Sequence, residues 1–284
     1  MSANDETPAK KSPYPLASRG SKEGRPSEIA VGGFSFGGPR IVVIAGPCAV
    51  ESPEQIMTIA KIVKGMGATM LRGGAFKPRS SPYSFQGLEG AGLGYLKAAG
   101  TENGMPVVSE IMDARHVPIF LEHDVDVLQV GARNMQNFTL LKELGKLKKP
   151  ILFKRGAGST VEEWLCAAEY ILYGGNPNVI LCERGINTFE TATRATLDIS
   201  AVPVLKHATH LPVIVDPSHA AGRPDIIPAL AKAAVAVGAD GLIMEVHHRP
   251  NDAMCDGKQA VLPEDFSILM DALRNVAPAV GRSV

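Results

Sequence analysis

The sequence shows no excess of charge of either sign, because its 284 residues carry 29 basic and 29 acidic side chains. Nucleic-acid-binding proteins carry a strong basic excess, so this balance argues against nucleic acid as a partner. The sequence also lacks an uninterrupted apolar segment long enough to span a bilayer. Residues 1–20 lack the apolar core of a secretory signal. We therefore expect neither a nucleic acid nor a membrane as a partner.

Cysteine is scarce as well, with four residues at irregular spacing and no tight pairing. This usage is typical of a reducing compartment rather than of a disulfide framework, and it predicts a cytoplasmic location. The sequence contains no Walker-type glycine loop, no dinucleotide-binding fingerprint and no nucleophile-elbow serine. The usual signatures of nucleotide binding and of serine hydrolysis are thus missing.

Short apolar runs alternate with helical runs from residue 41 onward, and eight such pairs predict parallel βαβ units. Capping boxes at residues 52–55 and 160–163 mark two helix starts, and helical runs are expected over residues 188–196 and 202–207. An open doubly wound sheet would collect its chemistry at one switch point, whereas polar residues follow nearly all of these strands. We therefore predict an α/β fold, a (β/α)8 TIM barrel.

The chain before the barrel divides into two parts. Residues 1–27 contain few large apolar side chains and are expected to form a disordered tail. Residues 29–40 place short apolar pieces around paired glycines, which predicts a β-hairpin that could plug the N-terminal mouth of the barrel. Residues 28–284 are then expected to form a single catalytic domain, without a fused regulatory domain.

Polar residues that could bind ligands or take part in catalysis follow the predicted strands. The clearest example is Asp216-Pro217-Ser218-His219, which comes directly after the apolar run of residues 211–215. The carboxyl ends of all strands in a parallel barrel meet on one face. The sequence therefore places its chemistry on one rim.

Four residues of this rim have side chains that bind divalent metals: Cys48, His219, Glu245 and Asp256. Each alone is more simply a buried thiol, a hydrogen-bonded imidazole or a solvated carboxylate, because no pair has zinc-finger spacing. Three of the four lie at or near predicted strand ends, which favours one shared site. One thiolate, one imidazole and two carboxylates suit Mn²⁺, Fe²⁺, Co²⁺ or Zn²⁺, and ligand type leaves the choice open.

Six basic residues follow the same strands: Arg72, Lys77, Arg79, Arg133, Lys154 and Arg184. Arginine binds carboxylate or phosphate through paired hydrogen bonds, and lysine adds a mobile point charge. Some of the six could instead pair with Glu110, Glu183 or Asp216. Six cations exceed what such pairing usually needs, so we predict a binding site for ligands with several anionic groups.

Five stretches resemble the motifs of one enzyme family: AGPCAVES at 45–52, LRGGAFKPR at 71–79, GARNMQNF at 131–138, CERG at 182–185 and DPSHA at 216–220. They closely resemble 3-deoxy-D-arabino-heptulosonate 7-phosphate (DAHP) synthases of the short type I-beta branch. That branch is related to 3-deoxy-D-manno-octulosonate 8-phosphate synthase. The resemblance extends over about residues 29–276.

The resemblance implies a metal-dependent condensation of phosphoenolpyruvate with erythrose 4-phosphate and water, the first step of the shikimate pathway. The metal would polarise the aldehyde, C3 of phosphoenolpyruvate would attack it, and Lys77 with a lowered pKa would protonate the new alkoxide. The implied metal ligands are Cys48, His219, Glu245 and Asp256, and the implied catalytic residues are Lys77, Cys48 and His219. The implied substrate-binding residues are Arg72, Lys77, Arg79, Ser80, Arg133, Lys154, Arg184 and Asp256.

Some residues depart from the family pattern. Ser80 stands where family members commonly have threonine, and serine keeps the hydroxyl. Residues 155–160 and Asn187 are less usual among family members. They are expected near the side of the barrel mouth that binds the aldose phosphate, so a different aldose phosphate remains an alternative. Pro78 favours the heptulosonate enzyme, because the octulosonate enzyme typically carries Ala-Asn after the lysine. A non-catalytic scaffold is a further alternative.

The resemblance also suggests a homotetramer or homodimer, and a separate partner such as a chorismate mutase stays open. Trp164 and Tyr170 could face another subunit, although burial against the barrel is the commoner fate. A last hypothesis concerns Cys255, which lies next to Asp256. In the absence of metal it could form a disulfide with Cys48, whereas the simpler interpretation is an inert loop thiol.

Overall fold

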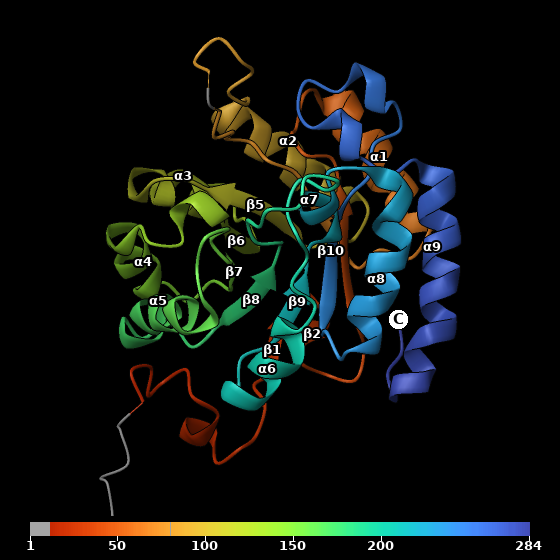
Figure 1. The fold of residues 1–284 in the computed structure, drawn as a ribbon. Helices are drawn as coiled ribbons and strands as arrows, with labels where there is room; N and C mark the ends of the chain where they lie inside the picture. The colour runs from red at the N-terminus through yellow and green to blue at the C-terminus, as the bar shows by residue number, and fades with distance from the viewer. Residues whose placement is uncertain (1–11, 80) are drawn as a thin grey trace, which may run out of the picture.

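Eight parallel strands close into one barrel in the computed structural model, which describes residues 12–79 and 81–284 (Figure 1). The order around the ring is β10-β3-β4-β5-β6-β7-β8-β9, so strands adjacent in sequence are adjacent in space. The barrel strands are β3 (Val42–Gly46), β4 (Met70–Arg72), β5 (Val107–Ile111), β6 (Val127–Val130), β7 (Ile151–Lys154), β8 (Val179–Glu183), β9 (Val213–Val215) and β10 (Gly241–Glu245). The predicted (β/α)8 barrel is confirmed.

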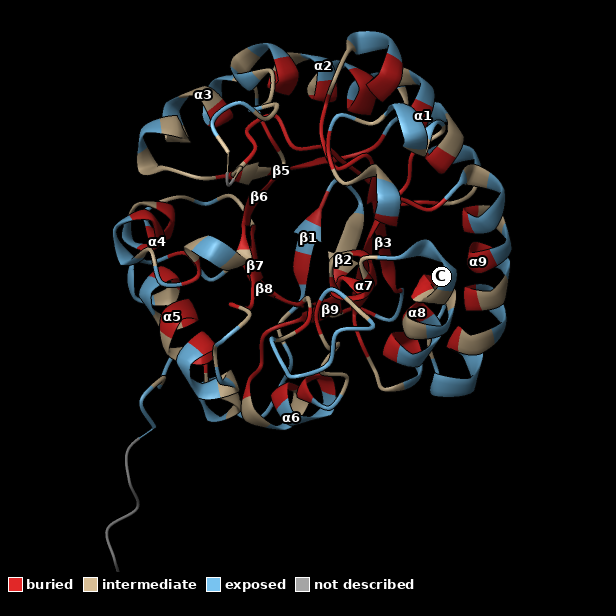
Figure 2. Ribbon diagram, turned by 45° about the horizontal axis from the view of Figure 1, so that its top comes forward, coloured by how far each residue is buried: buried red, intermediate tan, exposed pale blue. Residues whose placement is uncertain are grey.

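Helices surround the strands, with exposed residues outward and buried residues toward the sheet (Figure 2). The α-helices of the described residues are α1 (Pro53–Gly65), α2 (Glu89–Glu102), α3 (Val117–Glu122), α4 (Phe138–Gly145), α5 (Val161–Tyr173), α6 (Ala201–Ala208), α7 (Pro217–Ala221), α8 (Ile227–Ala236) and α9 (Pro263–Val276). The capping box predicted at the start of α5 forms, because Thr160 and Glu163 exchange hydrogen bonds. No helix within the described residues is long and apolar enough to cross a membrane.

Alternation of side chains along the strands divides the core into two clusters. Residues such as Val43 and Leu71 point outward and pack against the helices in the larger cluster. Residues such as Ile44 and Met70 point into the barrel and fill it. Because both faces of the sheet are covered, the strands are apolar nearly throughout, as the sequence indicated.

The predicted hairpin lies across the N-terminal mouth of the barrel. It consists of β1 (Ile29–Val31) and β2 (Phe34–Phe36), paired antiparallel, and both strands are seen in the centre of the ring in Figure 2. Ile29, Val31 and Phe36 are buried in the same cluster as the inward-facing barrel residues. The hairpin therefore closes the end of the barrel opposite the strand ends that carry polar residues.

The structure differs from the expected disordered tail for residues 12–27, whereas residues 1–11 lie outside the described residues. The backbone amides of Leu16 and Ala17 each donate a 2.8 Å hydrogen bond to the Glu169 carboxylate on α5. Ala17 is fully buried, and Ser18 forms a β-bridge with Thr209. The polar composition of residues 12–27 therefore led to a wrong prediction of disorder, because backbone hydrogen bonds fix this segment on the barrel.

The helix expected over residues 188–196 is absent, and this segment is a closed loop between β8 and α6. Ile186 and Thr196 exchange two 2.9 Å backbone hydrogen bonds, and the Thr188 and Thr196 hydroxyls lie 2.6 Å apart. The Glu190 carboxylate also accepts hydrogen bonds from two following backbone amides. Such side-chain bonds to the backbone compete with helix formation. The prediction was wrong here for that reason.

Candidate active site

Cys48, His219, Glu245 and Asp256 meet at the carboxyl ends of the strands. One ligand atom from each lies within 4.8 Å of the other three. The Cys48 sulfur is 3.3 Å from Asp256 Oδ2, and His219 Nε2 is 3.2 Å from Glu245 Oε1. Sulfur, imidazole and carboxylate donors converging in this way fit a divalent ion of borderline softness.

Two further side chains orient the members of this set. Asp216 is fully buried and lies 2.7 Å from Nδ1 of His219, which turns the opposite ring nitrogen toward Glu245. Gln259 donates a 2.5 Å hydrogen bond from Nε2 to Oε2 of Glu245. Carboxylate and amide partners of this kind fix the tautomer and direction of metal-binding side chains.

Burial and neighbouring groups also set the protonation of two of these side chains, His219 and Cys48. Burial lowers the pKa of His219, against the opposing attraction of Asp216, so the imidazole is neutral and able to bind a metal. The hydrogen bond with Cys255, followed by burial, raises the pKa of Cys48 well above its usual range. Metal binding would therefore release a proton from this thiol.

We call Cys48, His219, Glu245 and Asp256 the metal-competent set. Two of the predicted basic residues lie directly against it. Arg72, the last residue of β4, donates to Oε1 of Glu245 at 3.2 Å and to the backbone oxygen of Cys48 at 3.3 Å. The Lys77 ammonium donates to the Cys48 sulfur at 3.0 Å. Gly46 makes room for this arrangement, because a Cβ there would lie 2.2 Å from the Arg72 backbone oxygen.

The pKa of Lys77 is raised, which contradicts the lowered pKa expected from the sequence. Burial alone would lower it, as would the neighbouring charge of Arg72. The negative charge that Cys48 and Cys255 carry when ionised, together with that of Glu110, outweighs both and raises the pKa of Lys77. The prediction counted the cations around Lys77 and overlooked the thiols, so Lys77 is an ammonium group at neutral pH.

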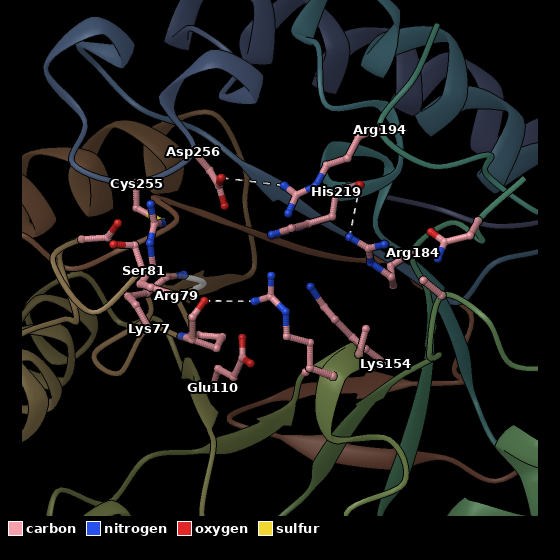
Figure 3. Close-up of a pocket in the computed structure, with 17 residues that line it drawn as sticks. Lys77, Arg79, Ser81, Glu110, Lys154, Arg184, Arg194, His219, Cys255 and Asp256 are labelled. Carbon is pink, nitrogen blue, oxygen red and sulfur yellow. Dashed lines mark hydrogen bonds and ion pairs between the residues drawn. The ribbon is translucent and has the colours of Figure 1, made fainter. Parts of the chain in front are cut away.

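A cavity of about 670 Å³ opens beside the metal-competent set (Figure 3). Basic side chains dominate its lining, and His219 and Asp256 reach it from the metal-competent set. The basic side chains that line it are Lys77, Arg79, Arg133, Lys154, Arg184 and Arg194. Five of the six cations predicted from the sequence are thus brought to one cavity, and Arg72 lies apart from it in the ion pair with Glu245.

The cations of the cavity differ in how far they are neutralised. Lys154 forms a buried 2.5 Å ion pair with Asp216, so pairing with a rim carboxylate does occur. Within residues 12–79 and 81–284, Arg133 and Arg184 form no ion pair, and they donate only to backbone oxygens of Pro78 and His219. Their positive charge is available to an anionic ligand.

Of Arg79 and Ser80, both expected to bind substrate, the structure describes only Arg79. Arg79 lines the cavity and donates a 2.7 Å hydrogen bond to the sulfur of Cys255. Ser80 lies outside the described residues. The Cys255 and Cys48 sulfur atoms are 3.4 Å apart, so the two thiols that the sequence suggested as a redox pair are neighbours.

Sequence reasoning missed the supporting roles of Asp216, Gln259 and Arg194. Asp216 was seen only as a pairing partner, although its spacing of three residues before His219 is typical of a helix N-cap, which it forms. Arg194 lies in a loop and Gln259 in a short 3-10 helix, Gly257–Gln259, where no strand end marks them. We find no signal in the sequence that would have distinguished either residue.

Comparison with known proteins gives a consistent result. A model of the DAHP synthetase I family matches residues 23–279. The phospho-2-dehydro-3-deoxyheptonate aldolase of Thermotoga maritima is 49% identical over 274 residues, which cover 96% of this chain and 80% of that protein. A crystal structure of the T. maritima enzyme superposes with a TM-score of 0.93 at 48% identity, covering 97% of this chain and 80% of the other.

A second group of relatives is more distant. The 2-dehydro-3-deoxyphosphooctonate aldolase of Koribacter versatilis is 29% identical over 264 residues, which cover 85% of this chain and 91% of that protein. The two groups are named for different products. Both are similar to this chain over most of its length, and the similarity to the heptonate enzyme is much greater.

Proposed function

The chain belongs to the DAHP synthetase I family, and on that premise we propose how its barrel joins phosphoenolpyruvate to erythrose 4-phosphate. The products are DAHP and phosphate, and the reaction is the first step of the shikimate pathway. The observation that carries the proposal is the convergence of four metal-competent side chains beside a cavity lined with cations. Such a site can activate a carbonyl and neutralise phosphoryl charge together.

Cys48, His219, Glu245 and Asp256 would hold one divalent ion, which when bound would polarise the aldehyde carbonyl of the acceptor. The donor set suits Mn²⁺, Fe²⁺, Co²⁺ or Zn²⁺, and elemental analysis of the purified protein would identify the ion. The neutral state of His219 and its contact with Asp216 support this assignment.

Phosphoenolpyruvate would bind with its phosphate on Arg133, Lys154 and Arg184. The support is that Arg133 and Arg184 donate only to backbone oxygens within the described residues, which leaves two guanidinium charges for the phosphate. Lys77, with Arg72 behind it, would bind the carboxylate.

The acceptor would lie at the outer part of the same cavity. Arg79 would bind its phosphate together with Ser80, by resemblance to the family, and Asp256 would contact its polar groups. Arg79 lines the cavity near Cys255 and Asp256, which supports this orientation. The two anionic substrates would then lie side by side, with the reacting carbons between the two groups of cations.

Lys77 would give a proton to the alkoxide that forms when the carbon–carbon bond is made. Its raised pKa keeps the proton on the nitrogen until a stronger base appears, and an alkoxide is such a base. The 3.0 Å contact with the Cys48 sulfur holds the ammonium group beside the metal-competent set. Charge neutralisation and proton donation would therefore come from one side chain.

Phosphate release from phosphoenolpyruvate tests the function and the acceptor together. Metal-free protein, and protein reloaded with each of the four ions, would be assayed with erythrose 4-phosphate or with a pentose 5-phosphate. We expect metal-dependent turnover with the tetrose, since the heptonate enzyme is the more similar relative. A preference for the pentose would transfer the proposal to the octulosonate reaction.

His219→Ala tests whether the metal-competent set carries the reaction, and His207→Ala is the matched control, because His207 is exposed on α6. We expect the first variant to lose orders of magnitude in turnover and the second to keep parental turnover. Parental turnover in His219→Ala would exclude this metal site. The scaffold alternative instead predicts no turnover in the parent protein.

A homo-oligomer in the cytoplasm is the assembly and location that we propose. Tyr170 supports an interface, because it is 39% exposed and stacks on the exposed ring of Phe138 at 4.6 Å, whereas Trp164 is fully buried. All four cysteines are free, which fits a reducing compartment. Light scattering of the purified protein, with and without a chorismate mutase, would test for a tetramer or dimer and for that partner.

A further inference from the structure

Arg194 is a basic residue of the cavity that the sequence did not single out. It lies in the closed loop between β8 and α6, and its backbone amide donates a 3.0 Å hydrogen bond to Ala221 at the end of α7. The next amide, that of Ala195, donates to Ala220 at 2.9 Å. These bonds attach Arg194 to the short helix that carries His219.

The side chain of Arg194 points toward Asp256 across the cavity (Figure 3). Its Nη1 lies 3.7 Å from Oδ1 of Asp256, the carboxylate oxygen that is not in contact with Cys48. The backbone of Asp256 is left-handed, with φ of 53°, a conformation that residues other than glycine adopt infrequently. The contact with Arg194 can therefore orient the Asp256 carboxylate from outside its own segment.

The same nitrogen of Arg194 makes a second and closer contact. Nη1 donates a 3.0 Å hydrogen bond to Oε1 of Gln259, which is buried. The amide group of Gln259 then donates from Nε2 to Oε2 of Glu245 at 2.5 Å. A continuous chain of hydrogen bonds thus runs from the guanidinium group to a second member of the metal-competent set.

We propose that Arg194 is a positioning residue for the metal site, holding Asp256 directly and Glu245 through the amide of Gln259. Arg194 would then link three segments that carry the proposed metal ligands. Its backbone is bonded to α7, and its guanidinium group reaches the loop after β10 and, through Gln259, the end of β10. Partners of this kind orient the lone pairs of ligands without touching the metal. The inference rests on the metal site proposed above.

The contacts distinguish this role from binding of substrate phosphate. Arg133 and Arg184 donate only to backbone oxygens within the described residues, as expected of cations kept for a ligand. Arg194 instead uses Nη1 for a side-chain amide and faces a carboxylate. Gly222 leaves space for it, because a Cβ at that position would lie 2.5 Å from the Arg194 Cβ.

The experiment measures metal affinity rather than activity. Metal-free parent, Arg194→Gln and Gln259→Met would be titrated with Co²⁺, and binding would be followed by the visible absorption of the ion. The matched control is Arg223→Gln, because Arg223 is an exposed arginine paired only with exposed Asp225 within the described residues. Melting temperature and circular dichroism would establish that each variant is folded.

We expect Arg194→Gln and Gln259→Met each to weaken Co²⁺ binding by about 10- to 100-fold, with Arg223→Gln unchanged. Because the two residues are coupled through one hydrogen bond, the double variant should lose less than the product of the two single-variant factors. If Gln259→Met fails to fold, Gln259→Leu replaces it, since an apolar side chain of similar size cannot donate to Glu245.

Three results would overturn the inference or its premise. A loss below tenfold in Arg194→Gln would show that Arg194 does not position the ligands. A raised KM for either substrate with parental Co²⁺ affinity would make Arg194 a substrate-binding residue instead. If the parent protein binds none of the four ions, the proposed metal site itself is wrong. That result differs from the first two, which concern only the role of Arg194.

Discussion

Lys77 combines two properties that a substitution can separate, a positive charge against the Cys48 sulfur and a proton that can be donated. We predict that Lys77→Met lowers turnover by about 10²–10⁴-fold, the range typical of a lost general acid. Lys77→Arg keeps the charge but does not release a proton, so it should lose most of that factor as well. Steady-state rates of phosphate release would measure both variants.

Lys64→Met is the control for these substitutions, because Lys64 is an exposed lysine in the last turn of α1. It should keep parental rates. If Lys77→Arg were as active as the parent, charge alone would account for the role of Lys77, and the proton donor would have to be sought elsewhere in the cavity.

The thiols of Cys48 and Cys255 lie close enough to react with each other when no metal holds Cys48. Their sulfur atoms are 3.4 Å apart, and a disulfide needs about 2.05 Å, so only a small movement is required. The hydrogen bond from Cys48 lowers the pKa of Cys255, which makes Cys255 the better nucleophile. Diamide would accept the two electrons and two protons that the pair releases.

We predict that diamide lowers the free thiol count of metal-free protein from four to two, and that bound Co²⁺ protects all four. Cys255→Ser should keep its three thiols, whereas Cys166→Ser, the matched control away from the site, should lose two. An unchanged count in metal-free parent protein would contradict the pairing and restore the interpretation of Cys255 as an inert loop thiol.

Residues of the site could be predicted where a strand ends and not where a loop folds back. Arg72, Lys154 and Glu245 are the last residues of their strands, so an apolar run followed by a charge was enough to find them. Arg194 comes from a loop and Gln259 from a short 3-10 helix, and the path of both segments depends on distant contacts. Lys77 shows the same limit for protonation, since the thiol of Cys255 is 178 positions away in the chain.

At the scale of elements, the segment of residues 12–27 is docked on the barrel through His210. Nε2 of His210 lies 2.9 Å from the Leu16 backbone oxygen, and Nδ1 lies 2.8 Å from the Ser27 hydroxyl. A neutral ring satisfies both contacts, donating through Nε2 and accepting through Nδ1. Burial lowers the pKa of His210 below its ordinary value of 6.5, which is consistent with that neutral ring.

This lowered pKa makes the free energy of unfolding depend on pH. The unfolded chain takes up the proton more readily, so the contribution of His210 is complete above about pH 6.5 and declines as the pH falls through the lower folded-state value. We predict that His210→Gln loses less stability than the parent between pH 7.5 and pH 5.5, as measured by urea unfolding.

His207→Gln is the matched control, since His207 is exposed three residues earlier in the chain. It should show the pH dependence of the parent. Equal pH dependence in His210→Gln and the parent would mean that other groups account for the acid sensitivity. The docking of residues 12–27 would then have no part in it.

The elements of the barrel were predictable because each is locally consistent, whereas the two wrong predictions fall on segments without periodicity. Short apolar runs that alternate with helical runs predict buried parallel strands, and strands that are neighbours in sequence are neighbours in the sheet. Residues 12–27 and 188–196 are fixed by specific hydrogen bonds, such as those of Glu169 and Thr188. Composition and pattern contain little information about such bonds.

At the scale of the whole molecule, the barrel brings together the proposed metal ligands, which are separated by as many as 208 positions, from Cys48 to Asp256. The unfolded chain has no such arrangement, so metal binding should stabilise the native state by about 2.7 kcal/mol at about 100 times Kd. We predict that saturating Co²⁺ raises the Tm of chelator-treated protein by about 5 °C. His219→Ala should abolish this shift and His207→Ala should keep it. A full shift in His219→Ala, measured by calorimetry, would place the bound ion elsewhere.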